Sequence, residues 1–253
     1  VFVHRTAPDE TVRVRVTEGR KRWARAELIE LVEASASRRP APCVHYNRCG
    51  GCTIEHMRYD AQLRAKAEIV REALRRIGGI ELDAPEVVPS PNEFRYRNRV
   101  SFALKRLRDG GVVAGFHVLG RPDRILDIGD ACLQPEPPLA DAWRALRAAW
   151  GPGAAHLPAG ADLRLTLRIG ESGALGLLIE GGTDEGDAEH LMRSAPGLIG
   201  VWQRADRGSP VVTLAGAPSM PERWDDFEFE LAPTAFLQVN RGTARLLEDH
   251  VLE

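Results

Sequence analysis

Three of the four cysteines in this chain lie within ten residues of one another, at Cys43, Cys49 and Cys52, in the pattern C-x5-C-G-G-C. The fourth, Cys132, follows eighty positions after the third. The two glycines of the pattern let the backbone turn tightly, so that three thiolates reach one centre. This spacing indicates a metal-ligand set, and we expect the folded chain to bring Cys132 to the same centre.

Three kinds of site use cysteines spaced in this way. A disulfide framework fits poorly, because stapled domains are short and rich in cysteine, whereas 253 residues bury a sizeable core. Four-thiolate zinc sites usually pair two C-x2-4-C knuckles, and this chain has one, although His45 and His56 are possible substitute ligands. An iron–sulfur cluster accommodates three clustered thiolates and a distant fourth. The pattern therefore favours a cluster, with zinc as the alternative.

The composition is that of an ordinary globular protein, with 43% hydrophobic and 28% charged residues. It contains no apolar run long enough to span a bilayer and no signal-peptide pattern, so we expect no membrane partner. We also expect a monomer. Thiolates kept as metal ligands indicate a reducing, cytoplasmic setting. The net charge of −2 conceals a bias, because 31 of the 34 basic residues are arginines (34 − 3 lysines). Arginine suits phosphate and base recognition, although a GC-rich coding sequence explains most of this excess.

Residues 1–39 are predicted to form part of a small β-domain. Residues 11–16 alternate apolar and charged side chains as a half-buried strand does, whereas residues 24–33 fit either a strand or a helix. The basic pair Lys21 and Arg22 lies between these two segments. Serines and prolines then lead into a cysteine segment over residues 40–60.

A central region, residues 61–232, is predicted to combine antiparallel strands with helices. The clearest helix runs from Tyr59 to Ile77, where apolar residues recur on one face and Gly78-Gly79 stops it. A second helix is expected over residues 139–150, with an apolar stripe of two tryptophans and a leucine, and a third over 184–193. Strands are expected over residues 94–102, 112–119, 163–169, 175–180, 200–204, 211–214 and 227–231.

The first of these strands carries a basic stripe. Phe94, Tyr96, Val100 and Phe102 would share one face, which leaves the arginines for the other face: Arg95, Arg97 and Arg99. Spaced about 7 Å apart along a strand, they could follow successive RNA phosphates without reading sequence. The alternative is a solvated face whose arginines pair with acidic neighbours.

Two segments imitate a nucleotide-binding loop, and we reject both. Residues 125–129 resemble the strand and turn that open a methyltransferase cofactor site, but only one glycine follows. The prolines at 135, 137 and 138 are expected to prevent the helix that would face the ligand. Residues 181–184 lack the later glycine of the dinucleotide fingerprint. The chain therefore shows no intact cofactor cradle.

In their order along the chain, the signals resemble those of the RNA uracil-5 methyltransferases that carry an iron–sulfur cluster. The resemblance covers nearly the whole sequence, and its most specific parts are the cysteine pattern and the F-L-Q-V-N segment. The matching residues are Pro42, Cys43, Cys49, Gly50, Gly51, Cys52, Tyr59, Gln62, Lys66, Phe94–Asn98, Cys132 and Phe236–Asn240.

The resemblance implies an α+β fold with four parts. Residues 1–39 would end a TRAM-like, OB-like β-barrel, residues 40–60 would carry the cluster, and residues 61–232 would form the RNA-facing domain. Residues 233–253 would begin a Rossmann-like methyltransferase domain with its first helix. The four cysteines would then hold a [4Fe–4S] cluster. Gln238 would lie in the site for S-adenosyl-L-methionine, and Phe236 would contact RNA.

The implied chemistry is methyl transfer to uridine C5, which makes 5-methyluridine. A cysteine thiolate adds to C6, C5 takes the methyl group, and a base removes the C5 proton before the thiolate leaves. All four cysteines here are assigned to the cluster, so we expect no catalytic residue in this chain and a truncation at both ends. The cluster and the TRAM-like segment favour ribosomal over transfer RNA as the substrate.

Two other classes of protein remain open. One is a radical S-adenosylmethionine enzyme, in which one iron of the cluster is left open for the cofactor. This class fits less well, because five residues separate Cys43 from Cys49 and because Cys132 would occupy that open position. The other is a non-enzymatic RNA-binding module that holds zinc or a cluster.

Overall fold

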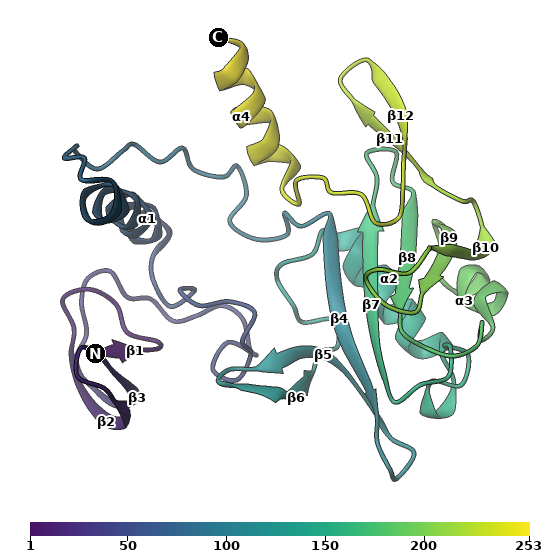
Figure 1. Ribbon diagram of the computed structural model, residues 1–253, viewed down its shortest axis with the longest axis horizontal. Coiled ribbons are helices and arrows are strands. Elements are labelled where there is room, and N and C mark those ends of the chain that lie inside the picture. Colours follow the sequence, from purple (N-terminus) through teal and green to yellow (C-terminus); the bar gives the residue numbers. More distant parts are fainter. The chain divides into compact units, whose positions relative to one another are not determined.

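The computed structural model describes residues 1–253 and divides them into two compact units, residues 1–90 and 91–253. Each unit is described by itself, and Figure 1 labels its helices and strands. Neither unit has a helix with the length and apolar character that crossing a bilayer requires.

The first unit begins with an open three-stranded sheet of order β1-β3-β2. The strands are β1 (Phe2–Val3), β2 (Thr11–Gly19) and β3 (Ala24–Glu33). The predicted alternation is present in β2, where half-buried valines separate exposed Arg13 and Arg15. These arginines pair across the strands with Glu30 and Glu27. Residues 24–33 are thus a strand, while closure into a barrel stays a prediction.

The predicted helix of the first unit is confirmed, together with its stop. Helix α1 (Tyr59–Ala73) continues as a π-helical turn over Leu74–Gly78, and Gly79 caps it with φ of 65°. Its predicted apolar face is mostly not buried: Ala67 is covered, but Ile77 is 88% exposed. Helical periodicity identifies such a face without saying what covers it.

The second unit is built on a seven-stranded sheet of order β10-β9-β8-β7-β4-β5-β6. All neighbouring strands are antiparallel except β8 and β9. The bounds are β4 (Arg99–Arg106), β5 (Val112–Val118), β6 (Arg121–Asp127), β7 (Asp162–Ile169), β8 (Leu175–Glu180), β9 (Leu198–Arg204) and β10 (Val212–Gly216).

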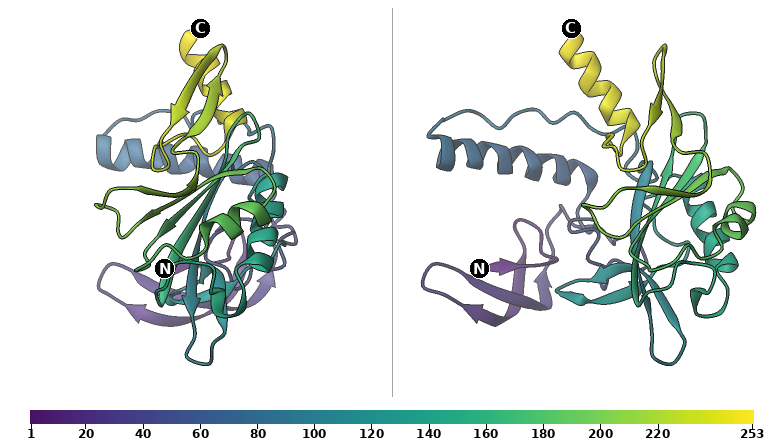
Figure 2. Two further views of the ribbon diagram at one scale, coloured as in Figure 1. Left: turned by 90° about the vertical axis from the view of Figure 1, so that its right-hand side faces the viewer. Right: turned by 45° about the vertical axis from the view of Figure 1, so that its right-hand side comes forward.

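Helices α2 (Pro137–Ala149) and α3 (Ala188–Ser194) cover one face of this sheet, as Figures 1 and 2 show. A short 3-10 turn, Pro152–Ala154, follows α2. The ring of Trp143 in α2 stacks on that of Phe102 in β4, with ring centroids 3.9 Å apart. Both side chains are almost fully buried and form the centre of the core.

The opposite face is covered over β8 and β9 by the last part of the chain. Leu178 and Trp202 pack there against Met220 and Leu231, with Leu237 alongside. This part includes the hairpin β11 (Met220–Trp224) and β12 (Phe227–Leu231), and then α4 (Arg241–Leu252), the helix predicted near this position. Hairpin and helix project from the same end of the unit (Figure 1).

The strand predicted over residues 94–102 is wrong in its first half, because β4 begins at Arg99. Arg95 has a left-handed φ of 57°, which breaks the alternation of a strand. Its N–H donates instead to the carbonyl of Leu133 at 2.8 Å, and that of Arg97 donates to Gln134 at 3.0 Å. Arg95, Arg97 and Arg99 therefore do not share one strand face.

The prolines after Cys132 act opposite to expectation. Pro137 and Pro138 begin helix α2 instead of preventing a helix. Proline fits the first turn of a helix, where a backbone N–H has no partner within the helix to lose.

Strand β11 has no counterpart among the predicted strands.

Candidate functional site

The cysteine segment of the first unit is held by one arginine from the N-terminus. The Arg5 guanidinium donates to the carbonyls of Cys52 at 2.7 Å, Tyr46 at 2.6 Å and Cys49 at 2.9 Å. It also lies 3.5 Å from the centre of the Tyr46 ring. Arg5 has a left-handed φ of 69°, a strained conformation held by these contacts. We call this arrangement the Arg5 clamp.

The thiols of this segment have the chemistry of soft-metal ligands. The N–H of Gly51 donates to the sulfur of Cys49 at 3.3 Å. Burial raises the pKa of the Cys43 thiol, with the charge of Glu55 acting in the same direction, so a metal would have to displace a proton there. No three His, Cys, Asp or Glu side chains are gathered closely enough to hold an ion. The donor set thus fits a soft centre in chemistry, while the side chains are not placed around one.

The alternative zinc ligands lie in the same segment. Nε2 of both His45 and His56 is buried without a hydrogen-bond partner. His56 Nδ1 lies 2.5 Å from the hydroxyl of Tyr46. Burial lowers the pKa of His56, which keeps its ring neutral at pH 7.

The fourth cysteine, Cys132, belongs to the second unit and is buried. Its carbonyl accepts a hydrogen bond of 2.8 Å from the Arg95 guanidinium. Arg95, predicted to bind RNA, therefore fixes the backbone of a predicted metal ligand. A shared centre for all four cysteines stays a prediction.

The F-L-Q-V-N segment presents alternate side chains outward. Phe236 is 77% exposed and Gln238 is also exposed, whereas Leu237 packs on the apolar cluster behind it. The backbone beneath them is fixed: Asn98 Nδ2 donates to the Gln238 carbonyl at 3.0 Å, and Arg168 donates to the Ala235 carbonyl at 2.7 Å. The segment is thus a rigid edge that offers an aromatic ring and an amide to a ligand.

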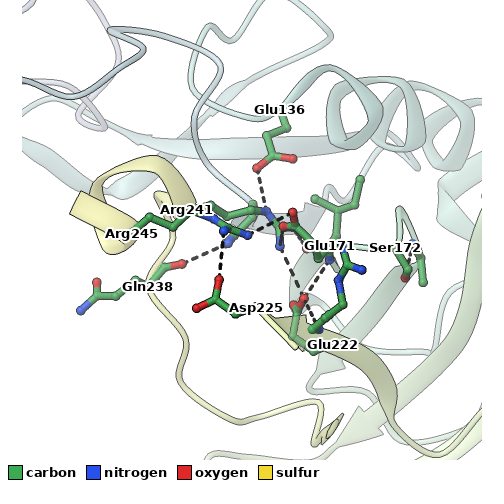
Figure 3. A network of polar contacts seen from close by, with 12 residues as sticks. Glu136, Glu171, Ser172, Glu222, Asp225, Gln238, Arg241 and Arg245 are labelled. Carbon is green, nitrogen blue, oxygen red and sulfur yellow. Dashed lines mark hydrogen bonds and ion pairs between the residues drawn. The ribbon is translucent and has the colours of Figure 1, made fainter. Parts of the chain in front are cut away.

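A network of charges anchors the helix that follows this segment. Arg241 lies 3.4 Å from a carboxylate oxygen of Glu136, 3.3 Å from Glu171 and 3.6 Å from Glu222, and donates to the carbonyl of Ile169. Figure 3 shows these contacts, with the Gln238 side chain pointing away from them. Burial raises the pKa of Glu136, against the opposing effect of Arg241. The sequence patterns do not reveal this network, because Glu136 and Glu171 lie 105 and 70 residues from Arg241 along the chain.

Of the three arginines predicted to form the basic stripe, Arg99 is the one that lies in the sheet, and its partner on the neighbouring strand is also an arginine. Arg99 and Arg168 are direct partners in the β4–β7 register. Burial, with the neighbouring charge of Arg99, lowers the pKa of Arg168 to about 10, and Nη1 of Arg168 is buried without a partner. Like charges directly opposite each other destabilise a sheet, so the pairing of Arg99 with Arg168 lowers the stability of the fold. Nothing in the fold explains why both positions are arginine.

The other predicted RNA contacts are on the surface. Lys21 and Arg22 are exposed in the turn between β2 and β3. Their position is compatible with binding a polyanion, and RNA binding by either residue stays a prediction.

The chain is similar along nearly its whole length to curated proteins named as uncharacterized RNA methyltransferases. It is 32% identical to one from Thermosynechococcus vestitus, over 98% of this chain and 58% of the relative. For Gloeobacter violaceus the identity is 33%, over 98% of this chain and 58% of the relative. For a relative from Synechocystis the identity is 29%, over 98% of this chain and 57% of the relative. No family model matches the chain.

A solved structure with a similar fold is that of Pyrococcus abyssi tRNA (uracil-54, C5)-methyltransferase in complex with S-adenosyl-L-homocysteine. The TM-score is 0.67 at 25% identity, and the match covers 99% of this chain and 59% of that one. The chain thus spans less than two thirds of the length of each of these proteins.

Proposed function

We propose that this chain, which is similar to RNA methyltransferases, functions in the S-adenosylmethionine-dependent methylation of RNA that makes 5-methyluridine. The observation that carries the proposal is the rigid edge at Phe236 and Gln238. Both side chains stand exposed on a backbone that Asn98 and Arg168 hold in place. A polar group contributes to binding or catalysis only when its surroundings fix it, and this edge meets that condition.

The residues of this edge have distinct proposed roles. The Gln238 amide offers a donor and an acceptor, which suits the edge of a uracil and a polar group of the cofactor. The Phe236 ring offers a stacking surface for an unpaired base. S-adenosylmethionine supplies the methyl group when bound, and we assign only Gln238 of this chain to it. The nucleophile and the base of the reaction are not assigned to these 253 residues.

The cysteines are proposed to hold a [4Fe–4S] cluster with a structural role, since methyl transfer requires no electron. Cys43, Cys49 and Cys52 would supply three thiolates and Cys132 the fourth. The Arg5 clamp supports this assignment, because it fixes the carbonyls of two of the three ligands in the first unit.

Ribosomal RNA is the substrate that the cysteine pattern and the N-terminal β-domain favour, and transfer RNA is the second candidate. The experiment uses the product of the complete gene with labelled S-adenosylmethionine and both RNAs, followed by nucleoside analysis. We expect 5-methyluridine in one of them and a loss of at least tenfold in rate for Gln238→Ala, with binding of iron unchanged. Stable RNA binding without any methylated product would instead favour a non-enzymatic RNA-binding module.

A further inference from the structure

The second unit contains an acidic pocket between the β7–β8 turn and the hairpin of β11 and β12. Its volume is about 520 Å³, which is within the range of ligand sites. Among its lining residues are four glutamates and a single basic side chain, Arg223. The glutamates are Glu171, Glu222, Glu228 and Glu230. We call this site the glutamate pocket.

One carboxylate oxygen in the wall of this pocket is buried without a partner. The side chain of Glu222 is 1% exposed. Its Oε1 accepts hydrogen bonds from the N–H of Glu171 at 2.8 Å and the N–H of Arg223 at 3.1 Å, and Arg241 lies 3.6 Å from the same oxygen. Oε2 has no hydrogen-bond partner. A buried charged acceptor without a donor is costly, so Oε2 favours a ligand that donates a hydrogen bond.

The arginines around the pocket do not balance its carboxylates. Six carboxylates line the pocket or pair with the arginines beside it: Glu136, Glu171, Glu222, Asp225, Glu228 and Glu230. Four arginines face them, including Arg168, which interacts electrostatically with Glu222: Arg168, Arg223, Arg241 and Arg245. Four positive charges against six negative ones leave −2. Such a site repels RNA phosphates and attracts a cation.

The charge of the hairpin itself points in the same direction. Residues 220–231 contain five acidic residues and one arginine, a net charge of −4. Glu228 and Glu230 are exposed on strand β12, so their carboxylates lie at the rim of the pocket. The glutamate pocket therefore offers a carboxylate in its wall and two more at its rim.

An aromatic ring opposite Glu222 indicates what kind of cation the site favours. Glu222 and Phe229 are direct partners in the β11–β12 register, so their side chains share one face with Cβ atoms about 4.5–5.5 Å apart. Phe229 is 38% exposed and lines the pocket. An organic ammonium group gains from both neighbours, through a charge-assisted hydrogen bond and a cation–π contact.

A metal ion fits this site less well. Hard divalent cations take several oxygen ligands and gain nothing from an aromatic ring. No three His, Cys, Asp or Glu side chains are gathered closely enough to hold an ion. The residues of the pocket thus favour an organic cation.

We infer that the glutamate pocket binds a linear aliphatic polyamine. One ammonium group donates to Oε2 of Glu222 and contacts the ring of Phe229. A second ammonium group lies at the rim, beside Glu228 and Glu230. Carboxylates both in the wall and at the rim favour a chain with more than one ammonium group over a single lysine side chain. The inference is independent of the proposed function, since it involves neither RNA nor methyl transfer.

Isothermal titration calorimetry of the 253-residue chain with spermidine tests this inference. Butylamine, which has one ammonium group, and Mg²⁺ are the comparison ligands at the same ionic strength. We expect a single site for spermidine, with an affinity about tenfold above that for butylamine, because the second ammonium group binds as part of the same molecule. Mg²⁺ should not compete for the site at equal concentration.

Three variants locate the site. Glu222→Gln keeps an oxygen for the two backbone N–H groups and replaces the Oε2 acceptor by an amide donor, so it should weaken spermidine binding about thirtyfold. Phe229→Leu should weaken it about fivefold through loss of the cation–π contact. Asp226→Asn is the matched control, because Asp226 is an exposed acid of the same hairpin outside the pocket. It should change affinity by less than about twofold.

Thermal denaturation of each variant separates loss of binding from loss of folding. If Glu222→Gln unfolds, the comparison of Phe229→Leu with Asp226→Asn decides the point. Unchanged binding by a folded Glu222→Gln overturns the inference, and so does an equal loss in Asp226→Asn, which would indicate attraction to the hairpin as a whole. Equal affinity for butylamine and spermidine overturns the choice of a polyamine. The methylation assay is unaffected by any of these results and tests the proposed function separately.

Discussion

The side-chain amide of Asn98 donates a hydrogen bond of 3.0 Å to the backbone carbonyl of Gln238, across 140 residues of sequence. The backbone N–H of Asn98 donates to the carbonyl of Val239 at 2.9 Å. Asn98 is 2% exposed, so both bonds are shielded from water. The residue before β4 thereby fixes the F-L-Q-V-N segment while the Gln238 side chain stays exposed.

Asn98→Ala should lower the free energy of unfolding of the second unit by about 1–3 kcal/mol, because it leaves the Gln238 carbonyl without its partner. Four of the five tryptophans lie in this unit, so tryptophan fluorescence in urea reports the change. Hydrogen exchange over residues 235–239 should accelerate. The exposed Glu185→Ala, in the same unit, serves as control, with an expected change within about 0.5 kcal/mol. Equal stability of the two variants would contradict the assigned role of Asn98.

The pair of Glu10 and Arg38 should make the first unit sensitive to acid. Burial raises the pKa of Glu10, but the hydrogen bonds from Arg38 and from the Ala7 N–H, with the charge of Arg38, together bring it below its ordinary 4.5. A lowered pKa in the folded state contributes stability above pH 4.5, which is lost as the pH falls through the folded value.

Glu10→Gln should therefore cost about 3 kcal/mol at pH 7, since it leaves a largely buried arginine without its carboxylate. The difference from wild type should shrink as the pH falls below about 4.5, which circular dichroism of unfolding at pH 7 and at pH 3 measures. Glu30→Gln, in an exposed pair with Arg13, should cost less than 1 kcal/mol at either pH. A pH-independent effect of Glu10→Gln would show that the pair does not titrate as described.

Gly176 in β8 should not tolerate a side chain. A Cβ at this position would lie 2.4 Å from a ring atom of Trp202 and 2.7 Å from the sulfur of Met220. Gly176→Ala should lower the free energy of unfolding by about 1–3 kcal/mol through overpacking. Gly129→Ala is the control, since nothing lies within 4 Å of its Cβ, and it should be neutral or slightly stabilising. Comparable urea midpoints for both variants would refute the close contact.

The four cysteines should bind iron and sulfide in one cluster. Anaerobically purified protein is expected to be brown, and Cys132→Ala should lose both the colour and part of the thermal stability. Iron, sulfide and zinc analysis provides the measurement. Stoichiometric zinc without iron or sulfide would contradict the assignment and support the zinc alternative with His45 or His56.

Local patterns were sufficient to predict most of the elements. The helix ending at Gly78-Gly79, the apolar stripe of α2 and the hairpin of β7 and β8 follow from periodicity and turn residues, and each is present in the structure. Such signals lie within one element, so the sequence itself contains them.

The errors and omissions involve contacts between distant segments. The left-handed Arg95 follows from hydrogen bonds to residues 132 and 133, which the pattern around Phe94 cannot reveal. The opposition of Arg99 and Arg168 depends on strand register, and the Arg241 network joins four separate segments of the chain. For α2, the position of Pro137 within the first turn decided whether proline ended or began a helix.

The Arg5 clamp also has a consequence for the order in which the cysteine segment folds and the proposed cluster is assembled. Arg5 and the carbonyls that it binds all lie within the first 52 residues, and the first unit is complete at residue 90. Ribosomes add about 5–20 residues per second and domains fold as units when they emerge, so Cys132 follows the last residue of the first unit by roughly 2–8 s. For that interval the nascent chain would expose three shaped thiols without their proposed fourth partner. Cluster assembly would then be a late step of biosynthesis, and oxidation of the waiting thiols would be its main hazard.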